Sequence, residues 1–68
     1  MNAPSHSPLV PIEAQVAEAE REYKKRLEVF PRWVEAGKIT QKEATHRLQC
    51  QLAIVHTLQL VAAGQRLI

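Results

Sequence analysis

One histidine and one cysteine are spaced so that a helix would place both on the same face. His46 and Cys50 are four residues apart, and side chains at that spacing lie on adjacent turns, where both could bind one metal ion. Two ligands do not complete a zinc site, and the chain has no CxxC motif, no HExxH motif and no second cysteine. The pattern predicts a small thiol beside a surface imidazole, with no metal and no cofactor.

Catalysis by the Cys50 thiol would need a positioned base and hydrogen-bond donors for an oxyanion. His46 or His56 could supply the base, but amides inside a helix are already bonded, and the two helices predicted below enclose no concave pocket. Carboxylates that could act as acids or bases are interleaved with cations on a charged face: Glu18, Glu20 and Glu22. We therefore expect no enzymatic activity.

Basic residues cluster in the first half of the chain and could contact phosphates. The cluster consists of Arg21, Lys24, Lys25 and Arg26. The net charge is only +2, and six of the seven acidic residues lie between Glu13 and Glu35, where they would oppose the same polyanion. A solvated face with salt bridges is the ordinary interpretation. Nucleic-acid binding by the cluster remains an alternative hypothesis.

The three aromatic side chains also belong to this half of the chain. Aromatic residues and arginine are enriched at protein interfaces. Phe30 and Tyr23 fit a core, whereas Trp33 is displaced from the apolar stripe and lies close to Pro31. The residues predicted to contact a partner are Phe30, Arg32 and Trp33.

A corner at residues 35–43 predicts the architecture. Gly37 can adopt the left-handed conformation that ends a helix, and Thr40 with Glu43 forms an S/T-x-x-E capping box that begins another. The corner predicts an all-α fold, an antiparallel hairpin of two helices spanning residues 12–68, with a turn at residues 37–40.

The first helix is predicted over residues 12–36, after a disordered leader at residues 1–11 that carries Pro4, Pro8 and Pro11. Pro31 removes one helical hydrogen bond, so the helix should kink near it or restart there. The apolar positions follow an 11-residue repeat: Ile12, Val16, Ala19, Tyr23, Leu27, Phe30 and Val34.

The second helix is predicted over residues 41–63, with Gly64 as its C-terminal cap. No Asp, Glu, Lys or Arg occurs between Leu48 and Gln65, and the apolar arc exceeds half the circumference. Such a helix normally packs against more than one neighbour. A homodimer forming a four-helix bundle is predicted, with an interface made of Leu48, Leu52, Ile54, Val55, Leu58 and Val61.

The lone cysteine, the N-terminal residues and the most apolar stretch of the sequence bear on the cellular location of the protein. A lone cysteine fits a reducing compartment, and residues 1–11 have neither the cationic start nor the apolar stretch of a secretion signal. Polar residues interrupt the most apolar stretch, so no membrane span is expected. We expect a soluble cytoplasmic protein.

Residues on both sides of the corner form one further pattern. An aromatic-Pro-x-aromatic-Val entry precedes a Gly-Lys/Arg-hydrophobic-Ser/Thr corner, an alanine and a Leu/Ile-rich helix. The positions concerned are Phe30, Pro31, Trp33, Val34, Gly37, Lys38, Ile39, Thr40, Ala44 and Leu48. This span resembles small helical-hairpin proteins of phages and prophages of proteobacteria, and the corner is similar to that of short bacterial oligomerisation domains of the SHOCT type. The phage resemblance implies an accessory protein that modulates a host or phage protein, without catalytic residues.

Three functional hypotheses follow. The first is a self-associating, non-enzymatic binding or regulatory protein with a host or phage protein as its partner. The second is a nucleic-acid accessory protein that uses the basic cluster. The third is a subunit of a larger assembly that folds only on its partner, for which the isolated chain would show low helicity.

Overall fold

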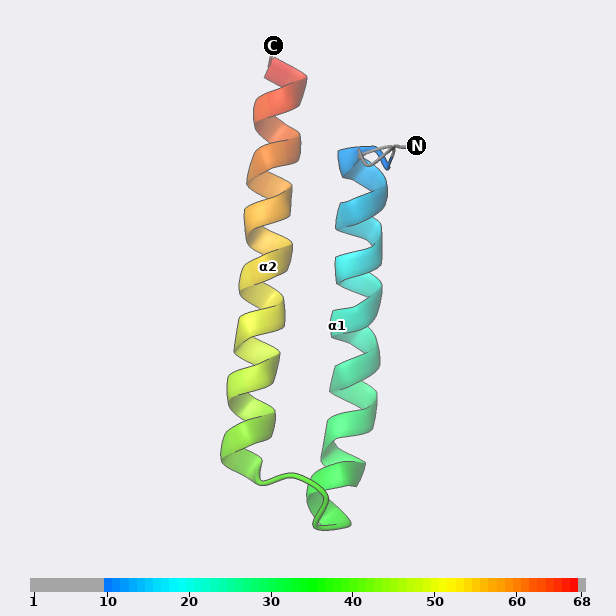
Figure 1. Cartoon of the computed structure of the whole chain (residues 1–68), viewed down its shortest axis with the longest axis vertical. Helices are drawn as coiled ribbons and strands as arrows, with labels where there is room; N and C mark the ends of the chain where they lie inside the picture. The colour runs from blue at the N-terminus through cyan, green and yellow to red at the C-terminus, as the bar shows by residue number, and fades with distance from the viewer. Residues whose placement is uncertain (1–9, 68) are drawn as a thin grey trace, which may run out of the picture.

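Two helices packed side by side make up the structure (Figure 1). The computed structural model describes residues 10–67, with side chains described up to residue 64. Helix α1 spans Ile12–Glu35 and helix α2 spans Gln41–Leu67, so the predicted all-α hairpin is confirmed. The predicted leader falls outside the described residues except for Val10 and Pro11. Neither α1 nor α2, as far as described, has a segment apolar enough to cross a bilayer.

The end of α1 is closed by a Schellman motif. Gly37 has a φ of 75°, in the left-handed region that favours glycine. Its N–H donates to the Val34 carbonyl at 3.0 Å, and the Lys38 N–H donates to the Trp33 carbonyl at 2.8 Å. These two bonds satisfy carbonyls that a helix end otherwise leaves unpaired, so the chain turns immediately after α1.

The capping box predicted for α2 is formed. The Glu43 N–H donates to Thr40 Oγ1 at 3.0 Å, and the Thr40 N–H donates to Glu43 Oε1 at 2.9 Å. Each residue therefore satisfies the free backbone N–H of the other. Because both partners lie within four residues of sequence, local chemistry alone fixes where α2 begins.

Helix α1 runs through Pro31 without a break, so the predicted restart at this residue does not occur. The N-cap is Pro11, whose carbonyl accepts hydrogen bonds from the N–H groups of Ala14 and Gln15 at 3.0 and 3.2 Å. Pro11 itself provides no side-chain cap. The Gln15 side-chain Nε2 donates to the Val10 carbonyl at 3.1 Å, so the start of α1 is held by these backbone bonds and one side-chain bond.

The face of α1 that meets α2 differs from the predicted 11-residue stripe. Leu27 is 46% exposed, whereas Arg26 is half-buried. The buried and half-buried positions repeat every seven residues, as in helices that pack side by side at a shallow angle. The positions that follow this repeat are Ile12, Val16, Ala19, Tyr23, Arg26, Phe30 and Trp33, and the other half-buried residues of α1 flank them: Glu20, Glu22, Val29 and Val34. A hydropathy pattern missed Arg26 because an arginine can bury its aliphatic stem while keeping its head polar.

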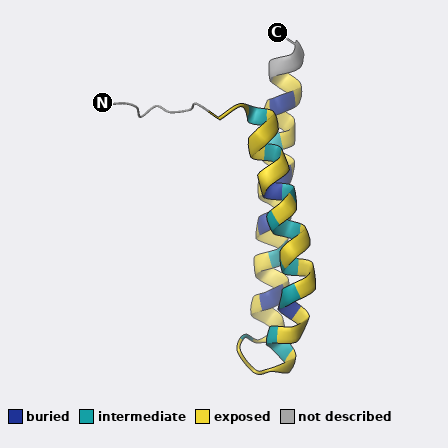
Figure 2. Cartoon of the chain, turned by 90° about the vertical axis from the view of Figure 1, so that its right-hand side faces the viewer, coloured by how far each residue is buried: buried dark blue, intermediate teal, exposed yellow. Residues whose placement is uncertain are grey.

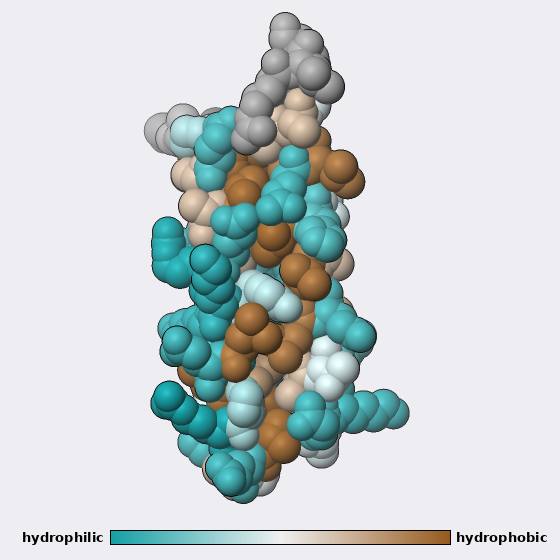
Figure 3. Space-filling model, turned by 180° about the vertical axis from the view of Figure 1, so that it is seen from behind, coloured by the Kyte–Doolittle hydropathy of each residue, from teal (hydrophilic) through white to brown (hydrophobic). Residues whose placement is uncertain are grey.

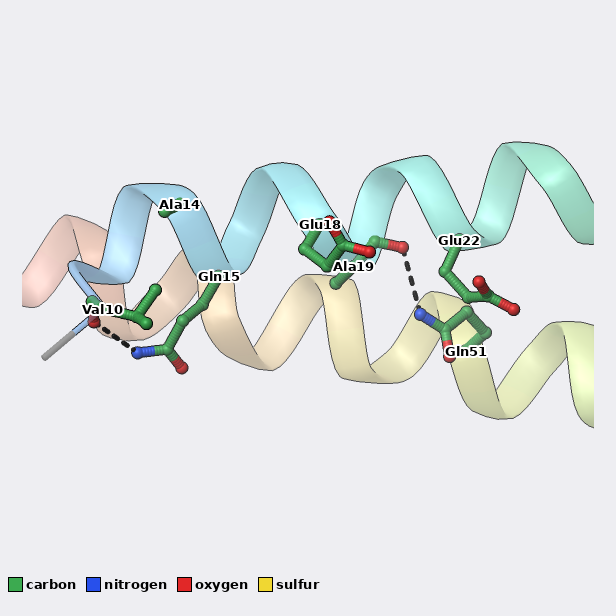
Figure 4. A pocket seen from close by; sticks show the side chains of 7 residues that line it. All are labelled: Val10, Ala14, Gln15, Glu18, Ala19, Glu22 and Gln51. Atoms are coloured by element: carbon green, nitrogen blue, oxygen red, sulfur yellow. Dashed lines mark hydrogen bonds between the residues drawn. The ribbon is translucent and has the colours of Figure 1, made fainter. Parts of the chain in front are cut away.

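Helix α2 follows the same seven-residue repeat, and one of its buried positions also holds a polar residue. Gln51 is 7% exposed and lies on the seam, the line where the two helices meet, whereas its neighbour Leu52 is half-buried. Its side-chain Nε2 donates to the Ala19 carbonyl of α1 at 3.0 Å (Figure 4). A buried amide is tolerated only when it is hydrogen-bonded, and this bond fixes the two helices in register.

The seam is narrow because most of its buried side chains are small. Among the described residues, the buried apolar side chains are Ala19, Phe30, Ala44, Val55 and Ala62. They recur along the line where the helices meet, and most of the remaining surface is exposed (Figure 2). Alanine lets two backbones approach closely but buries little apolar area. One hairpin therefore has a small core.

The second helix continues past its predicted end at Ala63. Gly64 was expected to cap α2, but the helix extends to Leu67. Gly37 is the glycine with positive φ in the described part of the chain, so Gly64 does not adopt the conformation of a cap. A Cβ added at Gly64 would meet no atom within 4 Å, so nothing in the hairpin requires glycine there.

The capping box can be tested by removing its hydroxyl. Thr40→Ala should lower the free energy of unfolding by about 1 kcal/mol, because the Glu43 N–H loses its acceptor. Urea unfolding followed by circular dichroism, at one chain concentration, measures this change. Thr45→Ala, an exposed threonine in the first turns of α2, is the matched control and should change stability by less than about 0.5 kcal/mol. Equal losses in both variants would contradict a capping role.

The capping box also predicts an acid-sensitive contribution to stability. The hydrogen bond from the Thr40 N–H lowers the pKa of Glu43 below its ordinary value of 4.5. The unfolded chain therefore binds more protons than the folded chain in this range, and the contribution is complete above pH 4.5. It is lost as the pH falls through the lowered pKa.

Glu43→Gln keeps a capping side chain but does not titrate. Its unfolding free energy should therefore fall less steeply than that of the wild type as the pH drops from neutral through 4.5. Urea unfolding at a series of pH values measures both slopes. An unchanged slope in the variant would show that Glu43 makes no such contribution.

Candidate partner-binding surfaces

An aromatic groove lies on one flank of the hairpin, toward the corner. Residues from both helices line it: Glu22, Lys25, Arg26, Val29, Phe30, Trp33 and Arg47. We refer to this set as the aromatic groove. It exists because the seven-residue register of α1 places Phe30 and Trp33 beside the first turns of α2. Phe30 is only 2% exposed, and Trp33 is half-buried.

Two guanidinium groups lie against the ring of Phe30. Arg47 Cζ lies 4.8 Å from the ring centroid and Arg26 Cζ lies 5.9 Å from it. The Trp33 ring stacks on Phe30 with centroids 5.5 Å apart and an angle of 29° between the planes. Cations are attracted to the faces of aromatic rings, so these contacts hold the side chains in place.

The two guanidinium groups differ in their ion pairing. Arg26 Nε donates to Glu22 Oε2 at 2.9 Å, and this hydrogen bond lowers the pKa of Glu22. Glu22 is therefore ionised at neutral pH, and it forms an ion pair with Arg26. For Arg47 and Lys25, no carboxylate within residues 10–64 lies at ion-pair distance. The aromatic groove thus carries two cations without a close ion pair among the described side chains, although Glu43 interacts electrostatically with Arg47 and Glu22 with Lys25.

A second surface is the side of α2 that faces away from α1. Its residues form the outer face: Cys50, Ala53, Ile54, Thr57, Leu60, Val61 and Gly64. The aliphatic members are exposed by 49% at Ile54, 74% at Leu60 and 44% at Val61. The outer face carries no charge. Apolar side chains also gather in a band along the back of the hairpin, flanked by hydrophilic ones (Figure 3).

The residues predicted to form a dimer interface are divided among different environments. Val55 is 4% exposed and is packed inside the hairpin, where a second chain does not reach it. Leu48, Leu52 and Leu58 are half-buried. Ile54 and Val61 are exposed and belong to the outer face, so they are the predicted interface residues most accessible to a partner.

The basic cluster of α1 is divided between two flanks. Lys25 lines the aromatic groove, whereas Lys24 lines a groove on the opposite flank with Tyr23 and Leu52. Arg21 is paired with Glu18, and Arg26 with Glu22. The four residues therefore do not form one continuous cationic surface, and half of them already contact carboxylates. Arg32, predicted to bind a partner, is exposed.

His46 and Cys50 lie together on the exposed side of α2, with Nε2 and Sγ 3.5 Å apart. In the part of the chain that the structure describes, no group of three or more His, Cys, Asp or Glu side chains is placed to hold a metal ion.

The chain matches no protein-family model, no curated protein and no solved structure.

Sequence reasoning identified Phe30 and Trp33 but missed the polar residues that complete their surroundings. Arg26 and Gln51 lie at four-three spacing from apolar seam residues, so a search that allowed polar seam positions would have found them. Arg47 is exposed and lies outside the seven-residue repeat of α2, so the spacing of the seam residues does not identify it. It contacts Phe30 only because the corner brings the start of α2 against the end of α1.

The contact between Arg47 and Phe30 predicts a small stabilisation. Arg47→Met keeps an unbranched stem and removes the cation, so it should lower the free energy of unfolding by about 0.5–1 kcal/mol. Lys42→Met removes a cation from an exposed position of the same helix and is the matched control. Thermal unfolding by circular dichroism compares the two. If Lys42→Met costs as much, the ring contact of Arg47 contributes nothing specific.

Proposed function

We propose that this chain is a non-enzymatic binding protein that self-associates, as a dimer forming a four-helix bundle, and modulates a protein partner. The observation that carries the proposal is the uncharged outer face of α2, where Ile54, Leu60 and Val61 are exposed. A monomer would leave this face in water while relying on a core in which residues 10–64 supply five buried apolar side chains, three of them alanine. Small domains with so little interior commonly gain stability by association.

The absence of charge supports a second copy as the occupant of the outer face. In a two-fold dimer the same patch lies on both sides of the interface. A patch with charges of one sign would meet like charges of its copy, whereas the outer face can meet itself without that cost. Its small members, Cys50, Ala53 and Gly64, would allow two helices to approach closely.

Gly64 adds an independent reason to expect a neighbour. Glycine inside a helix costs roughly 0.5–1 kcal/mol relative to alanine. Nothing within the hairpin lies against this position. Close approach of another backbone is an ordinary reason for such a residue, and Gly64 lies on the outer face.

The binding role is assigned to the aromatic groove, on a different surface from the outer face. Arginine and tryptophan are the side chains most often found to dominate binding energy at interfaces, and both occur here. The resemblance of residues 28–58 to helical-hairpin proteins of phages and prophages supports a regulatory role on a host or phage protein. Dimerisation would leave the groove of each copy accessible.

A charge placed on the outer face should dissociate the dimer. Ile54→Asp would bury a carboxylate in the interface, so we expect its mass by light scattering to fall from at least twice the 7.7 kDa chain mass to one chain. Ile54 is preferable to Val55 as a probe, because Val55 is inside the hairpin and its change to Asp would unfold the monomer itself.

Gln49→Asp is the matched control. It introduces the same charge on an exposed, polar position of α2 and should keep the mass of the wild type. The proposal fails if the wild-type chain has the mass of one copy, or if Gln49→Asp dissociates it as completely as Ile54→Asp.

A further inference from the structure

The aromatic groove holds a guanidinium group that is fixed in place and still has free hydrogen-bond donors. Arg47 Cζ lies over the ring of Phe30, 4.8 Å from the ring centroid. A contact with a ring face does not engage the N–H donors of a guanidinium, and none of the hydrogen bonds or ion pairs among the described residues uses those of Arg47. Arg47 is exposed, and no carboxylate among residues 10–64 pairs with it.

The neighbouring groups extend this cationic site. Lys25 lines the same groove and also lacks an ion-pair partner among the described side chains. Arg26 is held by Glu22, so the groove has three cations and one anion. Trp33 provides a half-buried ring that stacks on Phe30, and an indole N–H donor. The site combines free cationic donors with an aromatic surface.

The positions of the carboxylates beside the aromatic groove favour one kind of anionic ligand over another. Glu22 also lines the adjoining groove, together with Glu18, Gln15 and Ala14 (Figure 4). Toward the start of α1, this adjoining groove is therefore lined by two carboxylates and by no cation, while the arginines that pair with them lie outside it or in the aromatic groove. A nucleic-acid strand carries a phosphate at every nucleotide and would meet these carboxylates. A short ligand with carboxylates close to one apolar side chain would not.

We propose that the aromatic groove binds a short acidic peptide segment of a partner protein, with carboxylates on Arg47 and Lys25 and an apolar side chain on Trp33. A planar guanidinium with free in-plane donors matches the two oxygens of a carboxylate. This inference rests on the proposed binding function and names the chemistry of the partner.

The test uses the full chain and its single tryptophan as the reporter. The probe is a capped peptide of glutamate residues around one leucine and one phenylalanine. We expect a saturable change in Trp33 fluorescence at low salt that weakens as salt is added, because exposed charge pairs are screened. The same peptide with glutamine in place of glutamate should bind at least about tenfold more weakly.

Two matched pairs of variants assign the binding to the groove. Lys25→Gln and Arg47→Gln should each weaken peptide binding at least fivefold, on the order of 1 kcal/mol per charged contact. Lys24→Gln and Lys42→Gln remove the same charge from positions outside the aromatic groove and should leave binding within about twofold.

Three results would overturn the inference. They are the absence of saturable binding, equal weakening by the groove and control variants, and equally tight binding of a single-stranded oligonucleotide of the same charge. Light scattering on the same Lys25→Gln sample separates this question from self-association, because that variant should keep the wild-type mass whether or not the peptide binds.

Discussion

The narrowness of the seam between the two helices is the constraint on which the rest of the structure depends. Of the five buried apolar positions in the described part of the chain, alanine occupies three, and a glutamine occupies one place where an apolar residue would ordinarily pack. The helices approach closely and are held in register by the bond from Gln51 to the Ala19 carbonyl. The two helices cannot bury the remaining apolar surface of α2. A single neighbouring helix covers only one side of α2, so that surface stays in contact with water.

The parts of the fold that the sequence predicted correctly are those determined by local backbone chemistry. Gly37 ends α1 and the pair Thr40 and Glu43 begins α2, and each effect involves residues within a few positions of one another. Such rules need no knowledge of the partner helix. For the same reason the hairpin architecture followed from the corner alone.

The errors arose where a tertiary contact overrides polarity or propensity. Arg26 enters the seam because its charge is satisfied by Glu22 and its guanidinium lies over the Phe30 ring. Gln51 does so because a backbone carbonyl accepts its amide. Gly64 was interpreted as a cap, yet the helix continues through it. The candidate site was therefore predictable in its aromatic members, whereas Arg47 required the folded arrangement of both helices.

The two proposed roles use different parts of the molecule, so association and partner binding need not compete. The outer face is uncharged and lies on α2, while the aromatic groove is cationic and combines α1 with the start of α2. The proposed association would stabilise the fold by mass action, which gives the central claim a direct measurement. The thermal unfolding midpoint of the wild-type chain should rise with concentration across the micromolar range. A cooperative transition whose midpoint is the same at every concentration would contradict the account.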